Sequence, residues 1–153
     1  MRKEIRSCST PSYGTARRVS SRADYKAYCR LYLDVFGRTF NRRLALWLLK
    51  KEIHNRSYVW FAEDGNIAGI YALLQREDRR VTPDVSFKLL CNVAMAKEYQ
   101  GQGLSKYLLQ SALETAYNLG CSEVILDVAV GNQKAINLYT SLGFEFVDEQ
   151  PSE

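Results

Sequence analysis

One run of residues joins glycines to the start of an apolar helical pattern, and it consists of Gln100, Gly101, Gln102, Gly103, Leu104, Ser105 and Lys106. Glycine lets the backbone turn tightly, and the free N–H groups in a helix's first turn bind anions with help from the helix dipole. The run lacks the Gly-x-x-x-x-Gly-Lys-Ser/Thr spelling of a P-loop. It also lacks the Gly-x-Gly-x-x-Gly spelling of a dinucleotide site, because Lys106 stands at the third glycine position. The run therefore predicts a loop for another phosphate ligand or, alternatively, a plain tight turn.

Asp127 is the second residue that could do chemistry, because it interrupts residues 124–130, which are otherwise apolar. A carboxylate buried in such a strand is costly unless it is paired, and burial raises its pKa toward neutrality. A carboxylate with a pKa near neutrality suits a general base. The alternative interpretation is an acid that supports the structure or orients a substrate.

These candidates need a scaffold, and the second half of the chain alternates between strand and helix patterns. Residues 86–95 predict a strand, residues 103–119 a strong amphipathic helix, and residues 124–130 a strand buried on both faces. A strand, a helix and a strand in this order form a right-handed parallel crossover. A shorter helix and a short last strand follow, at residues 133–142 and 144–147.

The first half of the chain predicts helices and a hairpin. Apolar residues at helical spacing behind a pair of serines predict a helix that ends at residue 36, and residues 41–54 predict a second helix. Residues 58–62 and 67–74 predict strands, joined by an Asp-Gly pair that favours a tight turn. The polar residues 76–84 predict a loop. The whole pattern is that of an α/β domain with a mixed sheet.

Length and composition predict one folded domain without a membrane span. The chain has 153 residues, of which 25% are charged and 46% hydrophobic. Residues 1–20 form a basic N-terminal extension, with a first strand at residues 4–8 or at residues 16–19, and residues 21–153 form the domain. The basic residues of the extension fit a solvated arm or, alternatively, an arm that binds nucleic acid.

The cysteines and the single histidine predict no metal site. The cysteines stand at positions 8, 29, 91 and 121, so no pair has Cys-x-x-Cys spacing and a zinc ion would lack ligands. No apolar segment follows the basic start, so we expect no secretory signal. Free thiols and the missing signal favour a cytoplasmic protein.

Two blocks of the sequence resemble the signature of the GNAT superfamily of N-acetyltransferases. The first block follows a strand that ends in an apolar-Ala-apolar triplet and matches Gln/Arg-x-x-Gly-x-Gly/Ala at Gln100 and Gly103. Ser105 departs from the last position of that pattern but is also small. The second block, residues 132–144, resembles the family's Asn-x-x-Ala-x-x-Leu-Tyr-x-x-x-Gly-Phe block. The resemblance covers about residues 86–147.

The resemblance implies the GNAT fold, a central mixed β-sheet flanked by helices, whose parallel strands splay apart at the acetyl-CoA site. It implies acetyl-CoA as the donor substrate and no metal. The pyrophosphate would lie on the backbone N–H groups of the loop from Gly101 to Lys106. Asn132 would contact the CoA arm. The pantetheine would lie like an extra strand along the backbone of Val93, Ala94 and Met95.

The resemblance also implies an acid and a base. Tyr139 matches the family's general acid, and a phenol with a pKa of about 10 can protonate a thiolate whose conjugate acid has a pKa of about 8.5. Asp127 stands five positions before Asn132, where an acidic residue acts as the base in ribosomal-protein alanine N-acetyltransferases. The alternative for Tyr139 is a buried structural tyrosine.

These residues together predict direct acetyl transfer from acetyl-CoA to a primary amine in a ternary complex. The acceptor is a small amine or a peptide or protein N-terminus. An α-amine is neutral in roughly one molecule in ten at pH 7, whereas a lysine amine is neutral in roughly one in 10³. The alternative is a module that binds or senses acyl-CoA without catalysis. We expect no membrane partner and no nucleic acid.

The end of the chain departs from the resemblance, because only nine residues follow Phe144 and they suit one strand, not two. We therefore expect a short C-terminal end, with the sheet ending early at an unpaired edge. Such an edge would leave a wide acceptor cleft or would pair with a second copy in a homodimer.

Overall fold

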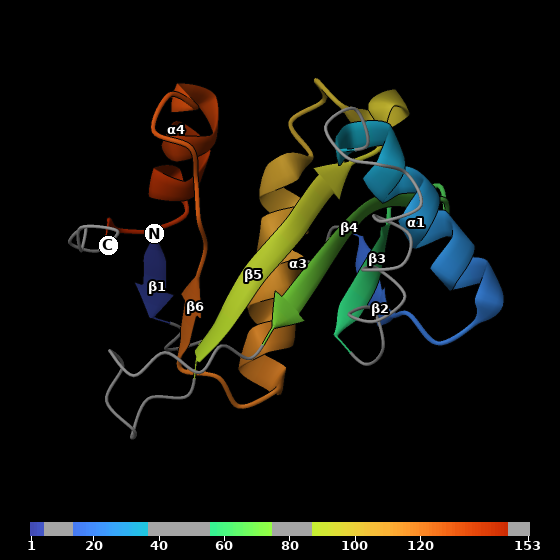
Figure 1. The fold of residues 1–153 in the computed structure, drawn as a ribbon, viewed down its shortest axis with the longest axis horizontal. Helices are drawn as coiled ribbons and strands as arrows, with labels where there is room; N and C mark the ends of the chain where they lie inside the picture. Colours follow the sequence, from blue (N-terminus) through green and yellow to red (C-terminus); the bar gives the residue numbers. More distant parts are fainter. Residues whose placement is uncertain (5–13, 37–55, 75–86, 147–153) are drawn as a thin grey trace.

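A computed structural model describes residues 1–4, 14–36, 56–74 and 87–146. These residues form a six-stranded sheet in the order β1-β6-β5-β4-β3-β2 (Figure 1). Neighbouring strands are antiparallel except β5 and β6, which are parallel, so the predicted mixed sheet is confirmed. The strands are β1 (Arg2–Glu4), β2 (Thr15–Arg18), β3 (Ser57–Phe61), β4 (Ile67–Leu74), β5 (Phe87–Met95) and β6 (Glu123–Ile125).

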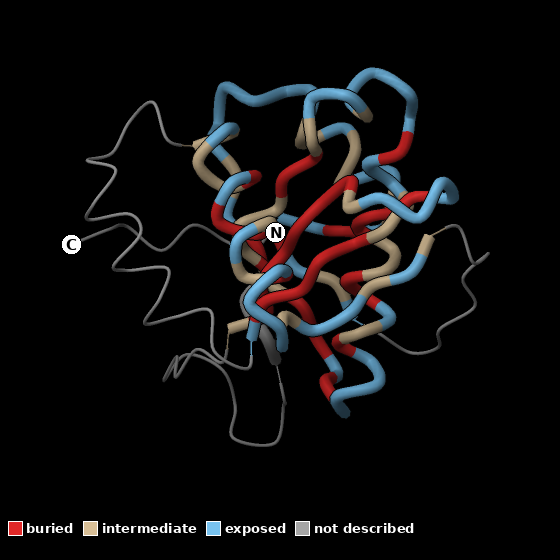
Figure 2. Tube along the Cα trace, turned by 90° about the vertical axis from the view of Figure 1, so that its right-hand side faces the viewer, coloured by how far each residue is buried: buried red, intermediate tan, exposed pale blue. Residues whose placement is uncertain are grey.

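Helices flank the sheet on both faces, as predicted. One face packs against α1 (Arg22–Phe36) and the other against α3 (Ser105–Asn118), and each face has its own apolar cluster. Buried residues follow the strands through the middle of the molecule (Figure 2). A short 3-10 helix, η1 (Lys97–Tyr99), follows β5, and α4 (Gln133–Ser141) stands beside the β6 end of the sheet.

The start of α1 is fixed by a cap and a buried ion pair. The Ser21 hydroxyl accepts a hydrogen bond from the Asp24 N–H at 3.1 Å, as expected of an N-cap serine. The buried Asp24 carboxylate binds both Nε and Nη2 of Arg17 in β2, at 3.1 and 2.6 Å. The hydrogen bond from Arg17 is the main cause that lowers the pKa of Asp24. The first helix and the second strand therefore form one unit.

The β3–β4 hairpin confirms the predicted Asp-Gly turn. Gly65 has φ +81°, a conformation that costs glycine little. The Asp64 side chain accepts a hydrogen bond from the Asn66 N–H at 2.9 Å, which closes the turn. The hairpin places β4 next to β5 and so builds the antiparallel part of the sheet.

The strand predicted over residues 124–130 is wrong in its length. The structure ends β6 at Ile125, and residues 126–130 run outside regular secondary structure. Val124 and Leu126 are buried, but Asp127 and Val130 are exposed, so the segment is not buried on both faces. The reason is that β6 pairs with β5 only as far as Leu89 and loses that neighbour beyond it.

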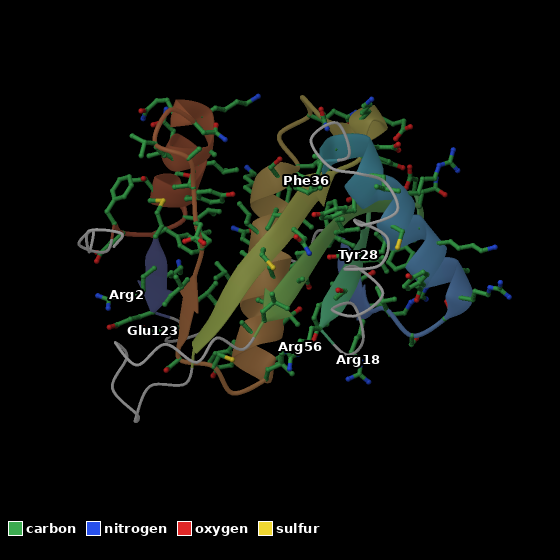
Figure 3. All side chains as sticks on the ribbon, viewed as in Figure 1. Arg2, Arg18, Tyr28, Phe36, Arg56 and Glu123 are labelled. Carbon is green, nitrogen blue, oxygen red and sulfur yellow. The ribbon has the colours of Figure 1, made fainter. Side chains whose placement is uncertain are left out.

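The side of β6 that faces away from β5 is occupied by β1, which the sequence did not predict there. β1 pairs antiparallel with β6 and places Lys3 opposite Val124. On its other side, Arg2 and Glu145 exchange two backbone hydrogen bonds of 2.8 and 2.9 Å. Figure 3 labels Arg2 on β1, at this end of the sheet. The N-terminal segment therefore forms the end strand of the sheet, and the homodimer expected from an unpaired edge stays a prediction.

Other predictions near the two ends of the chain have mixed outcomes. The first-strand alternative at residues 16–19 corresponds to β2, one residue earlier. Of the last predicted strand, residues 144–147, the described part contributes only the bridge at Glu145. The predicted helix at residues 41–54 and the predicted loop at residues 76–84 lie outside the described residues.

Candidate functional site

The two parallel strands separate toward their carboxyl ends. Register pairs Phe87 with Glu123 and Leu89 with Ile125, and β5 then continues to Met95 with β4 on one side but without β6 on the other (Figure 1). The predicted splay is therefore present. Ligands of open α/β sheets bind beyond the carboxyl ends of parallel strands, where neighbouring connections diverge.

The separation leaves one backbone edge of β5 open to the gap. Ala96 donates its N–H to Ala68 of β4 at 2.7 Å, and the register places Ala94 opposite Ile70. Because the donors of an antiparallel strand alternate in direction, the N–H groups of Val93 and Met95 turn away from β4 and toward the gap. This edge can bind an extended ligand as a further strand would bind.

A bulge lies where the gap begins. The register of β4 and β5 shifts between Ile70 and Ala72, and Asn92 has φ +55°. A non-glycine residue adopts this left-handed conformation rarely, and asparagine is one of those that tolerate it best. The Asn92 amide donates a hydrogen bond to the Tyr28 hydroxyl at 3.2 Å. The sequence analysis assigned no role to Asn92. Asn92 is a polar residue within an apolar strand, which is the same pattern that singled out Asp127.

The glycine loop is held by its own glutamines. Gln100 donates through Nε2 to the Met95 carbonyl at 2.8 Å, and Gln102 donates to the Glu98 carbonyl at 2.9 Å. Gly101 and Gly103 both have a left-handed φ, +77° and +72°. A Cβ added at either glycine would meet no heavy atom within 4 Å, so both face open space. The loop is therefore shaped to bring bare backbone to a surface.

The N-terminus of α3 carries donors that the fold does not use. Leu104 is the N-cap and has no side-chain capping bond, and the Tyr107 N–H is the first to reach an acceptor in the turn, Leu104 O at 3.0 Å. Within the described residues, no hydrogen bond is found for the backbone N–H groups from Gly101 to Lys106. Such a helix start attracts an anion. The Lys106 ammonium lies 4.9 Å from the centre of the Tyr107 ring, at the same end of α3.

The hairpin supports this loop from outside. The Tyr99 hydroxyl donates to the Asp64 carboxylate at 2.5 Å, which joins η1 to the β3–β4 turn. That hydrogen bond is the main cause of the lowered pKa of Asp64 and of the raised pKa of Tyr99. Sequence reasoning missed this link because the two residues are 35 positions apart.

Asp127 does not have the environment that was predicted for it. The residue is exposed and lies beyond the end of β6, so it is not a buried carboxylate in an apolar strand. It lies in the connection from β6 to α4.

The α4 residues have clear local roles. Asn132 is the N-cap of α4, and its side chain accepts a hydrogen bond from the Ala135 N–H at 3.3 Å. Tyr139 is partly buried, and its ring lies 5.8 Å from the ring of Phe144. Burial raises the pKa of Tyr139, so the phenol keeps its proton at neutral pH. The helix thus presents a protonated tyrosine packed on the α3 side of the sheet.

Within the described residues, no cluster of histidine, cysteine or acidic side chains could hold a metal ion. The same part of the chain has no helix long and apolar enough to cross a membrane.

Comparison with known proteins identifies the family to which most of the chain belongs. Residues 23–144 match the family model described as Acetyltransferase (GNAT) family. A rat protein, N-acetyltransferase 8F1, is 30% identical over 100 residues, which cover 64% of this chain and 44% of that protein. N-alpha-acetyltransferase 30 from Schizosaccharomyces pombe is 40% identical over 52 residues, which cover 34% of this chain and 35% of that protein. The chain thus spans less than half the length of either relative.

A solved structure supports the fold over a longer stretch. The spermidine N-acetyltransferase from Vibrio cholerae, in complex with CoA and spermine, superposes with a TM-score of 0.66. The match covers 87% of this chain and 81% of that one, at 24% identity. At that identity the likeness concerns the fold.

Proposed function

Since the chain belongs to the GNAT acetyltransferase family, we propose that it transfers an acetyl group from acetyl-CoA to a primary amine. The observation that carries the proposal is that the gap beside β5 and the bare N-terminus of α3 occur at the same end of the sheet. An extended arm ending in phosphates needs both features. The curated relatives are named as N-acetyltransferases, which supports the same activity.

The donor would be held mostly by backbone. Its pyrophosphate would lie on the N–H groups from Gly101 to Lys106, where amide dipoles and the Lys106 charge favour an anion. Its pantetheine arm would run along the open edge of β5, from Met95 toward Val93. The side chain of Asn132 caps α4, so its contact with the CoA arm would involve the atoms that the cap leaves available.

The chemical step would take place in the gap. A neutral amine attacks the thioester carbon, and the C–S bond breaks as the tetrahedral intermediate collapses. Backbone N–H groups near Val93 stabilise the oxyanion, which is the electrostatic term expected to matter most. Tyr139 donates its proton to the departing thiolate. The proton lost by the amine passes through water to Asp127, because that carboxylate is solvated.

The acceptor is a small amine or a peptide or protein N-terminus. A solvated carboxylate is a weak base, so it suits an amine that is already partly neutral at pH 7, as an α-amine is. The Schizosaccharomyces pombe relative is named as an N-alpha-acetyltransferase, whereas a solved neighbour is a spermidine N-acetyltransferase. A cytoplasmic location belongs to the same proposal and fits the buried free thiols of Cys29 and Cys121.

The test is thiol release from acetyl-CoA over a panel of amines, with each product identified by mass spectrometry. The panel holds peptides with free and blocked N-termini, spermidine, Nα-blocked lysine and an aminoglycoside. Acetylation of at least one amine at an enzyme-dependent rate supports the proposal. Binding of acetyl-CoA by calorimetry without any transfer would identify a sensing module instead, and no binding would refute the donor site.

A further inference from the structure

A buried polar chain links α1 to the bulge in β5. Tyr28 has no exposed surface, and its hydroxyl is hydrogen-bonded both by the Asn92 amide, at 3.2 Å, and by the side chain of Ser57. Ser57 is itself buried, at the start of β3. Figure 3 labels Tyr28 on the inner side of α1, facing the sheet. Two side-chain hydrogen bonds hold this buried hydroxyl in one position.

The bulge changes which way the residues of β5 face. Leu90, Val93 and Met95 belong to or pack against the cluster under α3, and Ala94 belongs to the cluster under α1. Asn92 reaches Tyr28 of α1, so strict alternation does not hold between Leu90 and Val93. One extra residue in β5 therefore resets the strand before it enters the gap.

The left-handed backbone of Asn92 needs support. A bulge residue with positive φ is usually glycine. Asn92 has φ +55°, and unlike glycine it carries a side chain that can form a hydrogen bond. The only side-chain hydrogen bond found for Asn92 within the described residues is the one to Tyr28. α1 packs across β3, β4 and β5, so its position relative to the sheet is fixed. The hydrogen bond from Asn92 to Tyr28 therefore ties the bulge to a helix that is held in place.

We propose that Tyr28 is a positioning residue, which acts through the Asn92 side chain to fix the direction of the Val93 N–H in the gap. This inference rests on the proposed function, because the group positioned there is the carbonyl oxygen of the acetyl thioester. Tyr28 touches neither substrate, and its effect is on the geometry of the donor that stabilises the oxyanion. It adds a residue from α1 to a site otherwise built from β5, α3 and α4.

The test compares Tyr28→Phe with Tyr25→Phe. Both remove one hydroxyl from α1 and keep the ring, and the Tyr25 hydroxyl is hydrogen-bonded to Cys29 of the same helix and not to Asn92. We expect Tyr28→Phe to lower kcat about tenfold or more with less than about a twofold change in acetyl-CoA affinity, the scale on which misplaced groups act. Tyr25→Phe should leave both values unchanged.

A double-mutant cycle shows whether Tyr28 acts through Asn92. In an Asn92→Gly background the backbone keeps its positive φ without the amide, so adding Tyr28→Phe should lower kcat no further. An equal loss of kcat in both backgrounds, or a loss of acetyl-CoA affinity in Tyr28→Phe as large as its loss of kcat, would overturn the inference.

A readout without turnover separates this inference from the proposed function. Backbone NMR shifts of Asn92 and Val93 in the free protein should move in Tyr28→Phe and stay in place in Tyr25→Phe. Unmoved shifts in Tyr28→Phe refute the positioning role even where the enzyme is active. If the wild-type protein acetylates no amine, the proposed function fails, and with it the catalytic meaning of Tyr28.

Discussion

Gly103 allows the structural cost of a substitution to be separated from its functional cost. Its φ is +72°, and a Cβ there would meet no heavy atom within 4 Å. Gly65, in the hairpin turn, has φ +81° and equally open surroundings. Alanine at either position therefore carries a similar backbone strain of about 1–2 kcal/mol. Both variants should lower Tm by about 2–8 °C, a range that follows from the size of the chain.

Only Gly103→Ala should also weaken donor binding. Its methyl group would occupy space over the N-terminus of α3, where phosphates must approach the backbone closely. We expect the Kd for acetyl-CoA to rise at least about tenfold, or about 1.4 kcal/mol, by calorimetry. Gly65→Ala should bind as the wild type does. Wild-type affinity in a destabilised Gly103→Ala would remove the loop from the donor site, and an equal loss of affinity in Gly65→Ala would show a general effect of strain.

Four further outcomes are expected. Tyr139→Phe should lower kcat on the order of 10²-fold at unchanged acetyl-CoA affinity in steady-state assays, and full activity would reduce Tyr139 to a packing role. Asp127→Asn should lower kcat/KM most below pH 7, where few acceptor amines are neutral, whereas an equal loss at every pH in the rate profile would indicate an orienting role. Lys3→Pro removes a backbone donor from β1 and should lower Tm by several degrees more than Lys3→Ala, and equal melting curves would mean that β1 does not dock on β6. Burial raises the pKa of Tyr28 and Tyr71 to about 12, against about 10 in an unfolded chain. The folded protein therefore keeps protons that the unfolded chain loses, and urea titrations should show stability falling as pH rises from 10 to 12, by up to about 1.4 kcal/mol per pH unit for each group. Constant stability over that range would contradict the burial of the two phenols.

The donor side of the site was predictable because its signals are local. Gly101 and Gly103 need their backbone freedom wherever the chain places them, and the helical pattern that follows predicts where α3 begins. The parallel crossover follows from a strand, a helix and a strand in order. The structure confirms these elements and the splay that lies between them.

The environment of Asp127 was not predictable from periodicity. An apolar run such as residues 124–130 fits a buried strand, but a strand also needs a neighbour on each side. β5 diverges after Leu89, so the segment after Ile125 has no partner there, and Val130 is 84% exposed. The length of β6 is set by another strand and not by its own residues.

The place of β1 in the sheet could not be predicted from the sequence. A strand of three residues, all of them charged, resembles a solvated arm. Its pairing depends on the free edge of β6 and on the bridge to Glu145, which are distant in sequence. Asn92 is the opposite case, because an amide inside an apolar strand could have been singled out by the reasoning that selected Asp127.

The docking of the first residues on β6 has a consequence for how the chain folds. The Met1 ammonium donates a hydrogen bond to the Leu126 carbonyl, 125 positions along the chain. The hydrogen bond from Lys3 to the Leu142 carbonyl spans 139 positions. During synthesis at about 5–20 residues per second, β1 leaves the ribosome on the order of ten seconds before its partner strand exists. Contacts of such high separation form slowly. We therefore expect the sheet to grow outward from the β3–β4 hairpin, and its β1 edge to close last.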